Sequence, residues 1–349
     1  MPNANFASSV LPNAVIRMED IFTGQNSRYA QYKTKKSELI KAINLRQTAR
    51  MNEVFMNGKC IGIQMVWLKD CTALGGYACE TAPTACAVPL IAETMTSDNQ
   101  IITPTCYMDE GFSLSDDLCN NEYTAEELIA ENLALHISNL DTRMNRYAYA
   151  QIMAKAQANI DPNTVGTTSG TITTIAPSDW TADLLVQLEI EAQFNGLENY
   201  LIFDSRNLLT QKNLSQYRGL NANEANTSAS FNDWDSRLIF DDPRDSKVVT
   251  LRDSTFFVDM AMVAFVNRTS YTSSAPVLAD ASDNFYTFSV TSPRTGIRYD
   301  VEYQKTCTGR DTTNLRVYQH KFNIKFIGGI VFPPVQCDNG TGILEFVKA

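Results

Sequence analysis

The sequence predicts an α+β protein with an extended N-terminal arm, a long excursion between strands, one very long helix, an α/β region and a strand-rich C-terminus. Three observations predict this class. Apolar residues repeat at helical spacing over residues 124–159, strand-like runs fill the last third of the chain, and the first 27 residues show no period. With 349 residues and 44% hydrophobic content, the chain can bury a core and form two structural regions.

The net charge of −10 limits the function classes. An acidic protein is a poor sequence-independent binder of nucleic acid, because Lys and Arg supply phosphate contacts, although a local basic patch stays possible. The N-terminus has no basic start followed by an apolar run, so no secretory signal is expected. The longest apolar candidate, Phe256–Val266, has 11 residues, whereas a membrane span needs about 20. We therefore expect a soluble protein made in a cytoplasm.

The N-terminal third predicts an arm, a helix and a strand-flanked excursion. Residues 1–27 are rich in Asn, Ser, Pro and Gly, which favours extended chain. Residues 28–56 carry apolar residues at loosely helical spacing, and Ile61–Trp67 and Ile101–Thr103 are strand-like. The long stretch between these strands is rich in Gly, Ala, Thr, Pro and Cys, and loops of this length are usually functional.

The helix over residues 124–159 is the strongest local prediction. Thr124 followed by Glu127 is a capping-box signature, and Asp161-Pro162 ends the pattern. At 1.5 Å per residue, the helix would be roughly 50 Å long. Its apolar positions repeat every three to five residues: Ile129, Leu133, Ile137, Leu140, Met144, Tyr147 and Ile152.

The remaining chain alternates helix and strand signals. A helix begins near Ser178-Asp179 and ends at Gly196, a C-cap residue. A third helix is expected from Arg206 to Tyr217, and residues 221–246 are expected to form a polar surface loop. Turn and strand are expected over residues 163–176, and strands over 200–203, 248–251, 256–266, 285–290, 299–303, 316–326 and 343–347.

A search for catalytic and ligand-binding chemistry gives no site. His136 and His320 are the chain's two histidines, and a packed or surface role is expected for both. The spacing of the cysteines contains no C-x-x-C pair, which favours free thiols over zinc, although some could oxidise later in a larger assembly. We predict no catalytic, cofactor-binding or metal-binding residue, with a Cys/His enzyme as a minority alternative. The eight cysteines are Cys60, Cys71, Cys79, Cys86, Cys106, Cys119, Cys307 and Cys337.

Other short patterns have ordinary interpretations. Gly166–Gly170 lacks the Lys of a phosphate-binding loop and indicates a turn. Asp233 and Asp235 lack the downstream residues of a calcium loop and indicate a solvated acidic surface. The Asn-x-Ser/Thr sites at Asn226 and Asn267 have no meaning without secretion.

Charge is segregated along the chain. Residues 28–50 carry seven Lys and Arg residues against one acid, whereas residues 109–131 carry eight acids and no Lys or Arg. The blocks could pair or be solvated within one chain, but complementary patches can also select a partner. We hypothesise that the basic segment meets the acidic segment of a neighbouring copy, so that reversal of Lys35, Lys36 and Lys41 to Glu would block assembly. Contact with packaged DNA is the rival use of the basic segment.

The order of these features resembles the major capsid protein of tailed bacteriophages, which has the Hong Kong 97-like fold. The resemblance covers nearly the whole chain as an architecture. It is carried by residues 101–112, by Thr124–Leu128 with the helix that follows, by Glu198–Arg206 and by Val317–Ile330. The cysteine-rich loop is not a feature that this family predicts.

The resemblance implies a domain plan and a structural function. The expected parts are an N-terminal arm and helix (1–56), an extended β-hairpin loop (57–110), a peripheral domain with a spine helix (111–177), an axial domain (178–300) and returning C-terminal strands (301–349). The implied function is self-assembly into pentamers and hexamers of an icosahedral shell in the virion, built in the host cytoplasm. Implied partners are packaged double-stranded DNA and possible portal, scaffold and decoration proteins, with no membrane, cofactor or enzyme activity. A tail-tube or minor capsid protein and an encapsulin-like shell remain alternatives.

Overall fold

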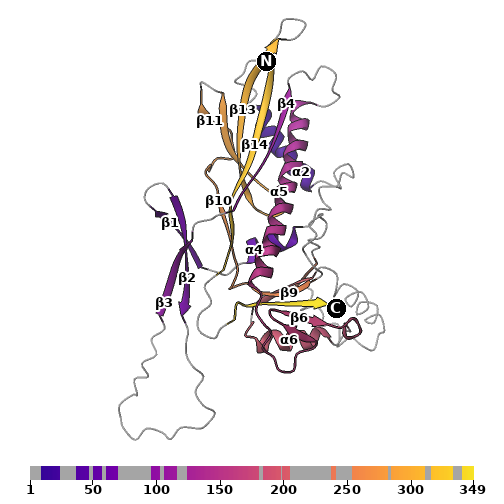
Figure 1. The fold of residues 1–349 in the computed structure, drawn as a ribbon. Helices are drawn as coiled ribbons and strands as arrows, with labels where there is room; N and C mark the ends of the chain where they lie inside the picture. Colours follow the sequence, from indigo (N-terminus) through magenta and orange to yellow (C-terminus); the bar gives the residue numbers. More distant parts are fainter. Residues whose placement is uncertain are drawn as a thin grey trace, which may run out of the picture.

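The computed structural model describes fourteen segments of the chain. They are residues 9–23, 37–46, 50–56, 60–69, 96–102, 106–115, 124–180, 184–197, 199–204, 237–240, 254–281, 284–310, 316–332 and 340–349. The described elements form an elongated body along one helix, with a small sheet standing beside it (Figure 1).

The helix α5, Ala125–Lys155, is the axis of the body and confirms the long helix predicted from the sequence. Its 31 residues extend about 46 Å at 1.5 Å per residue. Thr124 and Glu127 form the predicted capping box, and the helix ends four residues before the predicted end. The buried face includes the predicted apolar residues Ile129, Leu133 and Ile137.

A six-stranded antiparallel sheet runs along α5. Its order is β10-β14-β13-β12-β11, and β4 pairs with β14 off this path. The strands are β4 (Cys106–Ser115), β10 (Ala264–Arg268), β11 (Val277–Asp280), β12 (Phe285–Thr291), β13 (Arg298–Arg310) and β14 (Arg316–Val331).

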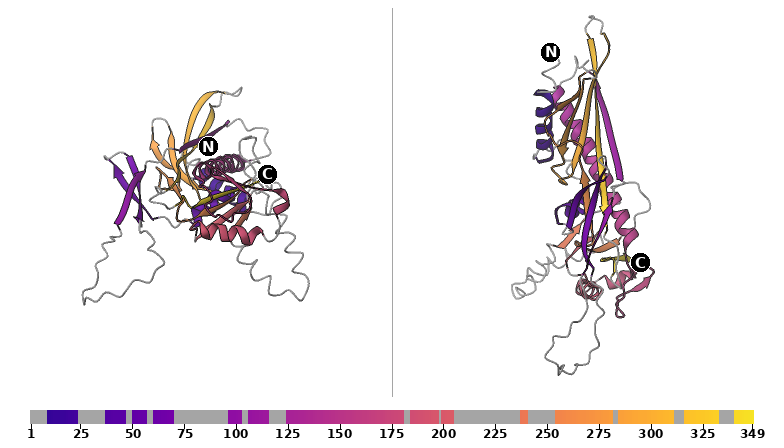
Figure 2. Two further views of the ribbon diagram at one scale, coloured as in Figure 1. Left: turned by 60° about the horizontal axis from the view of Figure 1, so that its bottom comes forward. Right: turned by 90° about the vertical axis from the view of Figure 1, so that its left-hand side faces the viewer.

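A second six-stranded sheet, of mixed direction, lies at the C-terminal end of α5. Its order is β5-β6-β15-β9-β7-β8, and the helix α6, Leu184–Phe194, packs on it (Figures 1 and 2). The strands are β5 (Thr167–Ser169), β6 (Ile172–Ile175), β7 (Tyr200–Asp204), β8 (Leu238–Phe240), β9 (Ser254–Asp259) and β15 (Ile343–Lys348).

The third sheet is a three-stranded antiparallel unit formed by β1 (Arg50–Met56), β2 (Cys60–Lys69) and β3 (Thr96–Ile102). Among the described residues these strands pair only with one another, and the sheet stands apart from the body in Figure 1 and in the left view of Figure 2. The pairing of β2 with β3 confirms the predicted strands on either side of the excursion. The excursion itself, residues 70–95, lies outside the described residues.

Two helices complete the body. The helix α2, Leu11–Thr23, packs beside the N-terminal half of α5, and α4, Glu38–Arg46, packs beside its C-terminal half (Figure 1). The main core contains buried residues of α2, α4, α5, the first sheet and one side of the second sheet, and a smaller core lies between α6 and the second sheet.

Several sequence predictions for the first half of the chain are wrong. Residues 11–23 form a helix rather than an extended arm, because Leu11, Ala14, Met18 and Ile21 supply a helical stripe that α5 buries. The predicted helix over 28–56 is observed only as α4, since residues 50–56 pair as a strand. The acidic segment of residues 109–131 begins within strand β4, Cys106–Ser115, which pairs with β14 and was not predicted.

Differences in the second half arise from pairing between distant strands. The predicted strand over 256–266 is divided between β9 and β10, which belong to different sheets. The predicted surface loop over 221–246 contains β8, and β11 was not predicted. The predicted helix over 206–217 and the predicted strand over 248–251 lie outside the described residues. The other predicted strands, the turn at Gly170 and the end of α6 before Gly196 are confirmed.

Candidate functional site

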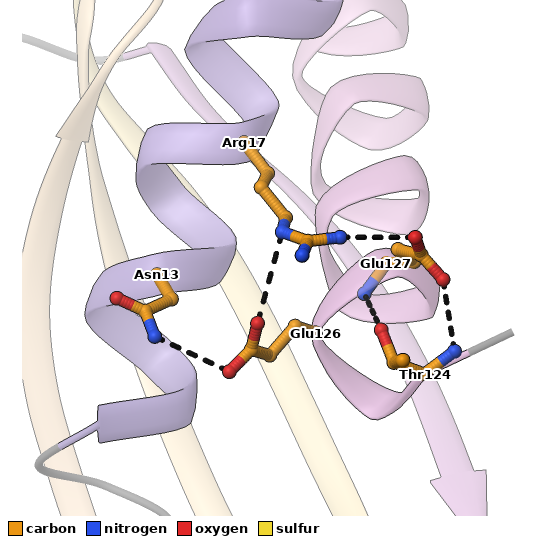
Figure 3. Close-up of polar contacts among 5 residues, drawn as sticks. All are labelled: Asn13, Arg17, Thr124, Glu126 and Glu127. Carbon is orange, nitrogen blue, oxygen red and sulfur yellow. Dashed lines mark hydrogen bonds and ion pairs between the residues drawn. The ribbon is translucent and has the colours of Figure 1, made fainter.

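A polar contact between two helices joins α2 to the N-terminus of α5 (Figure 3). Asn13 Nδ2 donates to Glu126 Oε1 at 3.2 Å, and Arg17 Nη1 donates to Glu127 Oε1 at 3.0 Å. Arg17 Nε lies 3.7 Å from Glu126 Oε2. The acidic first turn of α5 also suits the positive end of the helix dipole. These contacts fix α2 on the same helix that buries its apolar stripe.

Glu127 serves both the contact with α2 and the cap of α5. Thr124 N donates to Glu127 Oε2 at 2.9 Å, and Glu127 N donates to Thr124 Oγ1 at 3.3 Å. The backbone and side-chain hydrogen bonds with Thr124, followed by Arg17, lower the pKa of Glu127. Docking of α2 and capping of α5 therefore share one carboxylate.

We expect Arg17→Glu to loosen α2 more than it affects the whole fold. The substitution places a carboxylate beside Glu126 and Glu127, but all three positions are partly exposed and screened by solvent. Hydrogen exchange should accelerate in α2 and in the first turn of α5, while the global unfolding midpoint changes little. Lys41→Glu, at an exposed residue on α4, is the control, and equal acceleration of α2 in both variants would contradict the prediction.

The acidic block of residues 109–131 is partly neutralised within its own chain. Glu126 and Glu127 pair with Arg17, and Glu110 Oε1 lies 3.2 Å from Arg143 Nη1. Lys41 of the basic block pairs with Glu38 in the same helix, at 3.7 Å between Nζ and Oε2. The hypothesis that these blocks pair between copies stays a prediction, and Lys35, Lys36, Asp116, Asp117 and Glu122 lie outside the described residues.

The two histidines lie in separate contacts. His136 Nδ1 is 3.0 Å from Glu110 Oε2, and its ring stacks on Phe112. His320 Nδ1 is 2.7 Å from the hydroxyl oxygen of buried Tyr303. Both arrangements fit side chains that stabilise packing between elements.

The described cysteine side chains do not form a reactive pair with a histidine. Burial raises the pKa of the Cys106 thiol, and the positive charge of Arg143 opposes that shift. Cys307 is an exposed free thiol on β13. A raised pKa reduces the thiolate fraction that a nucleophile needs. The other six cysteine side chains lie outside the described part of the chain.

A buried carboxylate joins α5 to the turn before β13. Asp141 Oδ1 accepts hydrogen bonds from Tyr299 Oη at 2.6 Å and Thr295 Oγ1 at 2.8 Å, and Asp141 Oδ2 accepts one from Ser292 Oγ at 2.6 Å. Asn44 Nδ2 of α4 donates to Thr295 O at 3.0 Å, which brings a third element into the cluster. Burial raises the pKa of Asp141, while the three hydroxyl groups and then Arg294 oppose the rise. The sequence could have indicated burial of Asp141, because it lies four residues after Ile137, on the same face of the helix.

A second buried carboxylate, Glu191, joins α6 to the chain after α5. Val165 N donates to Glu191 Oε1 at 2.7 Å, and Glu191 Oε2 accepts from Asn159 Nδ2 at 2.6 Å and Thr164 Oγ1 at 2.9 Å. Asn195 Nδ2 donates to Asn159 Oδ1 at 2.8 Å. Burial raises the pKa of Glu191, and these hydrogen bonds oppose the rise. No short motif marks this cluster in the sequence.

We expect Glu191→Gln to destabilise the protein by about 1–3 kcal/mol, because all three groups around the carboxylate are donors and an amide nitrogen cannot accept from them. Urea unfolding would measure the loss. Glu189→Gln on the same helix is the matched control, since Glu189 forms a partly exposed pair with Arg237. That control should change stability by about 0–1 kcal/mol. Equal effects of the two substitutions would contradict the assigned role of Glu191.

The described residues give no direct indication of a cofactor or a membrane span. Among them, no group of three or more His, Cys, Asp and Glu side chains could hold a metal ion. None of the described helices combines the length and apolar content that a bilayer crossing requires. Within Gly166–Gly170, Thr167–Ser169 form strand β5, and the predicted turn lies at Gly170, which has a φ of 62°. Asn267 lies on β10, whereas Asn226, Asp233 and Asp235 lie outside the described residues.

Comparison with known proteins gives structural neighbours only. No protein-family model and no curated protein sequence matches the chain. The capsid structure of cyanophage P-SCSP1u is similar over 86% of this chain and 89% of that chain, with 11% identity and a TM-score of 0.40. The mature capsid of bacteriophage PhiM1 is similar over 82% of this chain and 81% of that chain, with 12% identity and a TM-score of 0.40. The encapsulin SrpI of Synechococcus elongatus is similar over 72% of this chain and 77% of that chain, with 8% identity and a TM-score of 0.34.

Proposed function

We propose that this chain is the major capsid protein of a tailed bacteriophage, with a Hong Kong 97-like fold. It self-assembles through pentamers and hexamers into the icosahedral shell of the virion. The observation that carries the proposal is the small sheet β1-β2-β3, which stands beside the body and whose strands pair only with one another in the described part of the chain (Figures 1 and 2). A single sheet needs a second layer to bury a face, and a neighbouring copy can supply that layer.

The domain plan follows the two large sheets. We assign α5 with the sheet β10-β14-β13-β12-β11 and β4 to the peripheral domain, and α6 with the second sheet to the axial domain. This assignment differs from the division expected from the sequence. Strands β10, β11 and β12 join the peripheral domain, which also takes the whole of β4 and β13, whereas β5, β6 and β15 join the axial domain. The β1-β2-β3 sheet and residues 70–95 form the extended loop.

The protein acts without catalysis, because a shell subunit needs complementary surfaces rather than a reactive group. Heterologous contacts between identical copies can close into rings and continue into a shell. Packaged double-stranded DNA faces the inner wall, portal, scaffold and decoration proteins are further partners, and assembly takes place in the host cytoplasm.

The test is negative-stain imaging of the purified full-length protein, with light scattering on the same sample, alone and with the scaffold protein of its own virus. Closed shells, or rings of five or six copies, are expected. Tubes would assign the chain to a tail instead. A sample that stays monomeric under both conditions would contradict the proposal.

A variant can test the role of the separate sheet. Replacing residues 60–102 with a Gly/Ser linker should leave the body folded, with a cooperative thermal transition by circular dichroism close to that of the parent. The reason is that the two large sheets, as far as the structure describes them, do not pair with these strands. The variant should not form shells. Shells of normal size would contradict the assigned role of the β1-β2-β3 sheet.

A further inference from the structure

The helix α6 is apolar on its outer side as well as on its inner side. Leu184, Leu188 and Ala192 are buried in the smaller core. On the opposite side, Val186, Ile190 and Phe194 are 58%, 57% and 55% exposed. A surface helix normally carries polar residues on its outer side, and a helix that is apolar all round is normally covered. The outer side of α6 is therefore a candidate contact surface.

The apolar surface continues beyond α6 to Ile160, which is 66% exposed. The backbone N of Ile160 donates to Asn195 Oδ1 at 3.1 Å, so Ile160 lies beside the C-terminal end of α6. We call these four residues the α6 patch. Each of its four large apolar side chains belongs to a residue that is more than half exposed, and the largest apolar patches on monomeric proteins are often functional.

Buried polar contacts hold the two parts of the α6 patch in a fixed arrangement. Glu191 on α6 accepts hydrogen bonds from Asn159 and Thr164, which flank Ile160 in sequence. Asn195, next to Phe194, bonds to both Asn159 and Ile160. A surface that is already ordered loses less conformational entropy when a partner covers it.

The composition around the α6 patch favours a second copy of this chain as the partner. Each copy carries a net charge of −10, so copies repel one another unless their contacts avoid acidic surface. The patch has no charged member, and its exposed neighbours Gln187 and Gln193 are neutral. The nearest surface acid on α6, Glu189, is paired with Arg237.

The size of the α6 patch favours repeated contacts over a single pair. A stable interface usually buries about 800 Å² on each partner, which is more than this patch provides. A contact of this size becomes effective when every copy makes it within a closed ring or shell, because the other contacts raise its effective concentration. We propose that the α6 patch is a contact between neighbouring copies in the assembled shell, which rests on the proposed function.

The test compares substitutions in full-length protein under the conditions in which the parent chain assembles. Ile190→Glu should raise the critical concentration for assembly at least tenfold and leave the thermal midpoint of the unassembled protein close to that of the parent. The double variant V186Q/F194Q removes the apolar contact without adding charge and should act in the same direction. Leu45→Glu is the matched control, since Leu45 is equally exposed but lies on α4.

A photo-cross-linking residue at position 190 gives an independent readout. Bands of two or more linked copies are expected from assembled protein and not from dilute monomer. Normal assembly of both patch variants, absence of such bands, or equal inhibition by Leu45→Glu would overturn the α6 patch as a contact. In each of these outcomes the parent still forms shells, and the proposed function stands. Failure of the parent itself to assemble would overturn both.

Discussion

Asp141→Ala is expected to lower the free energy of unfolding by about 3–5 kcal/mol, because three buried hydroxyl groups lose their shared acceptor at a cost of about 1–3 kcal/mol each, partly relieved by rearrangement. Asp141, Ser292 and Thr295 are all buried, so water does not replace the carboxylate directly. Typical domains are stable by about 5–15 kcal/mol, so the loss is a large fraction of the total. Urea unfolding followed by tryptophan fluorescence would measure it.

Asp141→Asn is the matched variant, because its amide oxygen can still accept while its nitrogen cannot. We expect this variant to lower the free energy of unfolding by about 1–2 kcal/mol, which is less than the loss for Asp141→Ala. Equal stability of the parent and both variants would show that the cluster does not hold α5 to the turn before β13.

The same pair of proteins tests the protonation of Asp141. Burial raises the pKa of its carboxyl above the value of about 3.9 in unfolded chains. At a pH between the unfolded and the folded pKa of this carboxyl, the folded state binds more protons than the unfolded state. This group therefore stabilises the fold most at low pH, and its contribution is lost as the pH rises through the folded pKa. Asp141→Asn lacks this titration. The stability difference between parent and variant should therefore shrink from pH 4 to pH 7, and a constant difference would contradict the raised pKa.

Local signals in the sequence predicted the elements whose residues supply their own pattern. Helix α5 followed from Thr124, Glu127 and the apolar repeat, and β7 followed from a short run of large apolar residues. Helix α2 was missed because Pro12 and the Asn and Ser residues around it suggested extended chain. Its four apolar residues become a stripe only when α5 is present to bury them.

The parts that could not be predicted depend on distant partners. The residues of β4 include acidic ones, but Cys106–Ser115 form a strand because their backbone pairs with β14 along this stretch. The Glu191 cluster draws its donors from residues about 30 positions earlier, so no short motif reveals it. The α6 patch was likewise hidden, since the sequence does not tell which side of an apolar helix faces the sheet.

Gly328→Ala is expected to destabilise the protein by about 3 kcal/mol, at the upper end for overpacking. A Cβ at this position would lie 2.1 Å from the backbone oxygen of Val266 and 2.6 Å from Phe326 Cζ. Gly328 is the point at which β14 passes from β4 to β10, since it is opposite both Cys106 and Asn267. A backbone oxygen cannot move by a change of rotamer, so β10 must separate locally from β14.

Gly170→Ala is the control, because it tests backbone conformation without crowding. Gly170 has a φ of 62°, and a Cβ there would meet no atom within 4 Å. Alanine at such a φ should cost about 1 kcal/mol. The measurement is urea unfolding of both variants together with hydrogen exchange of the β10 amides, which should accelerate only in Gly328→Ala. Equal losses of unfolding free energy in both variants, with the β10 amides still protected from exchange, would contradict the prediction. Glycine at position 328 would then not be required by the close approach of β10.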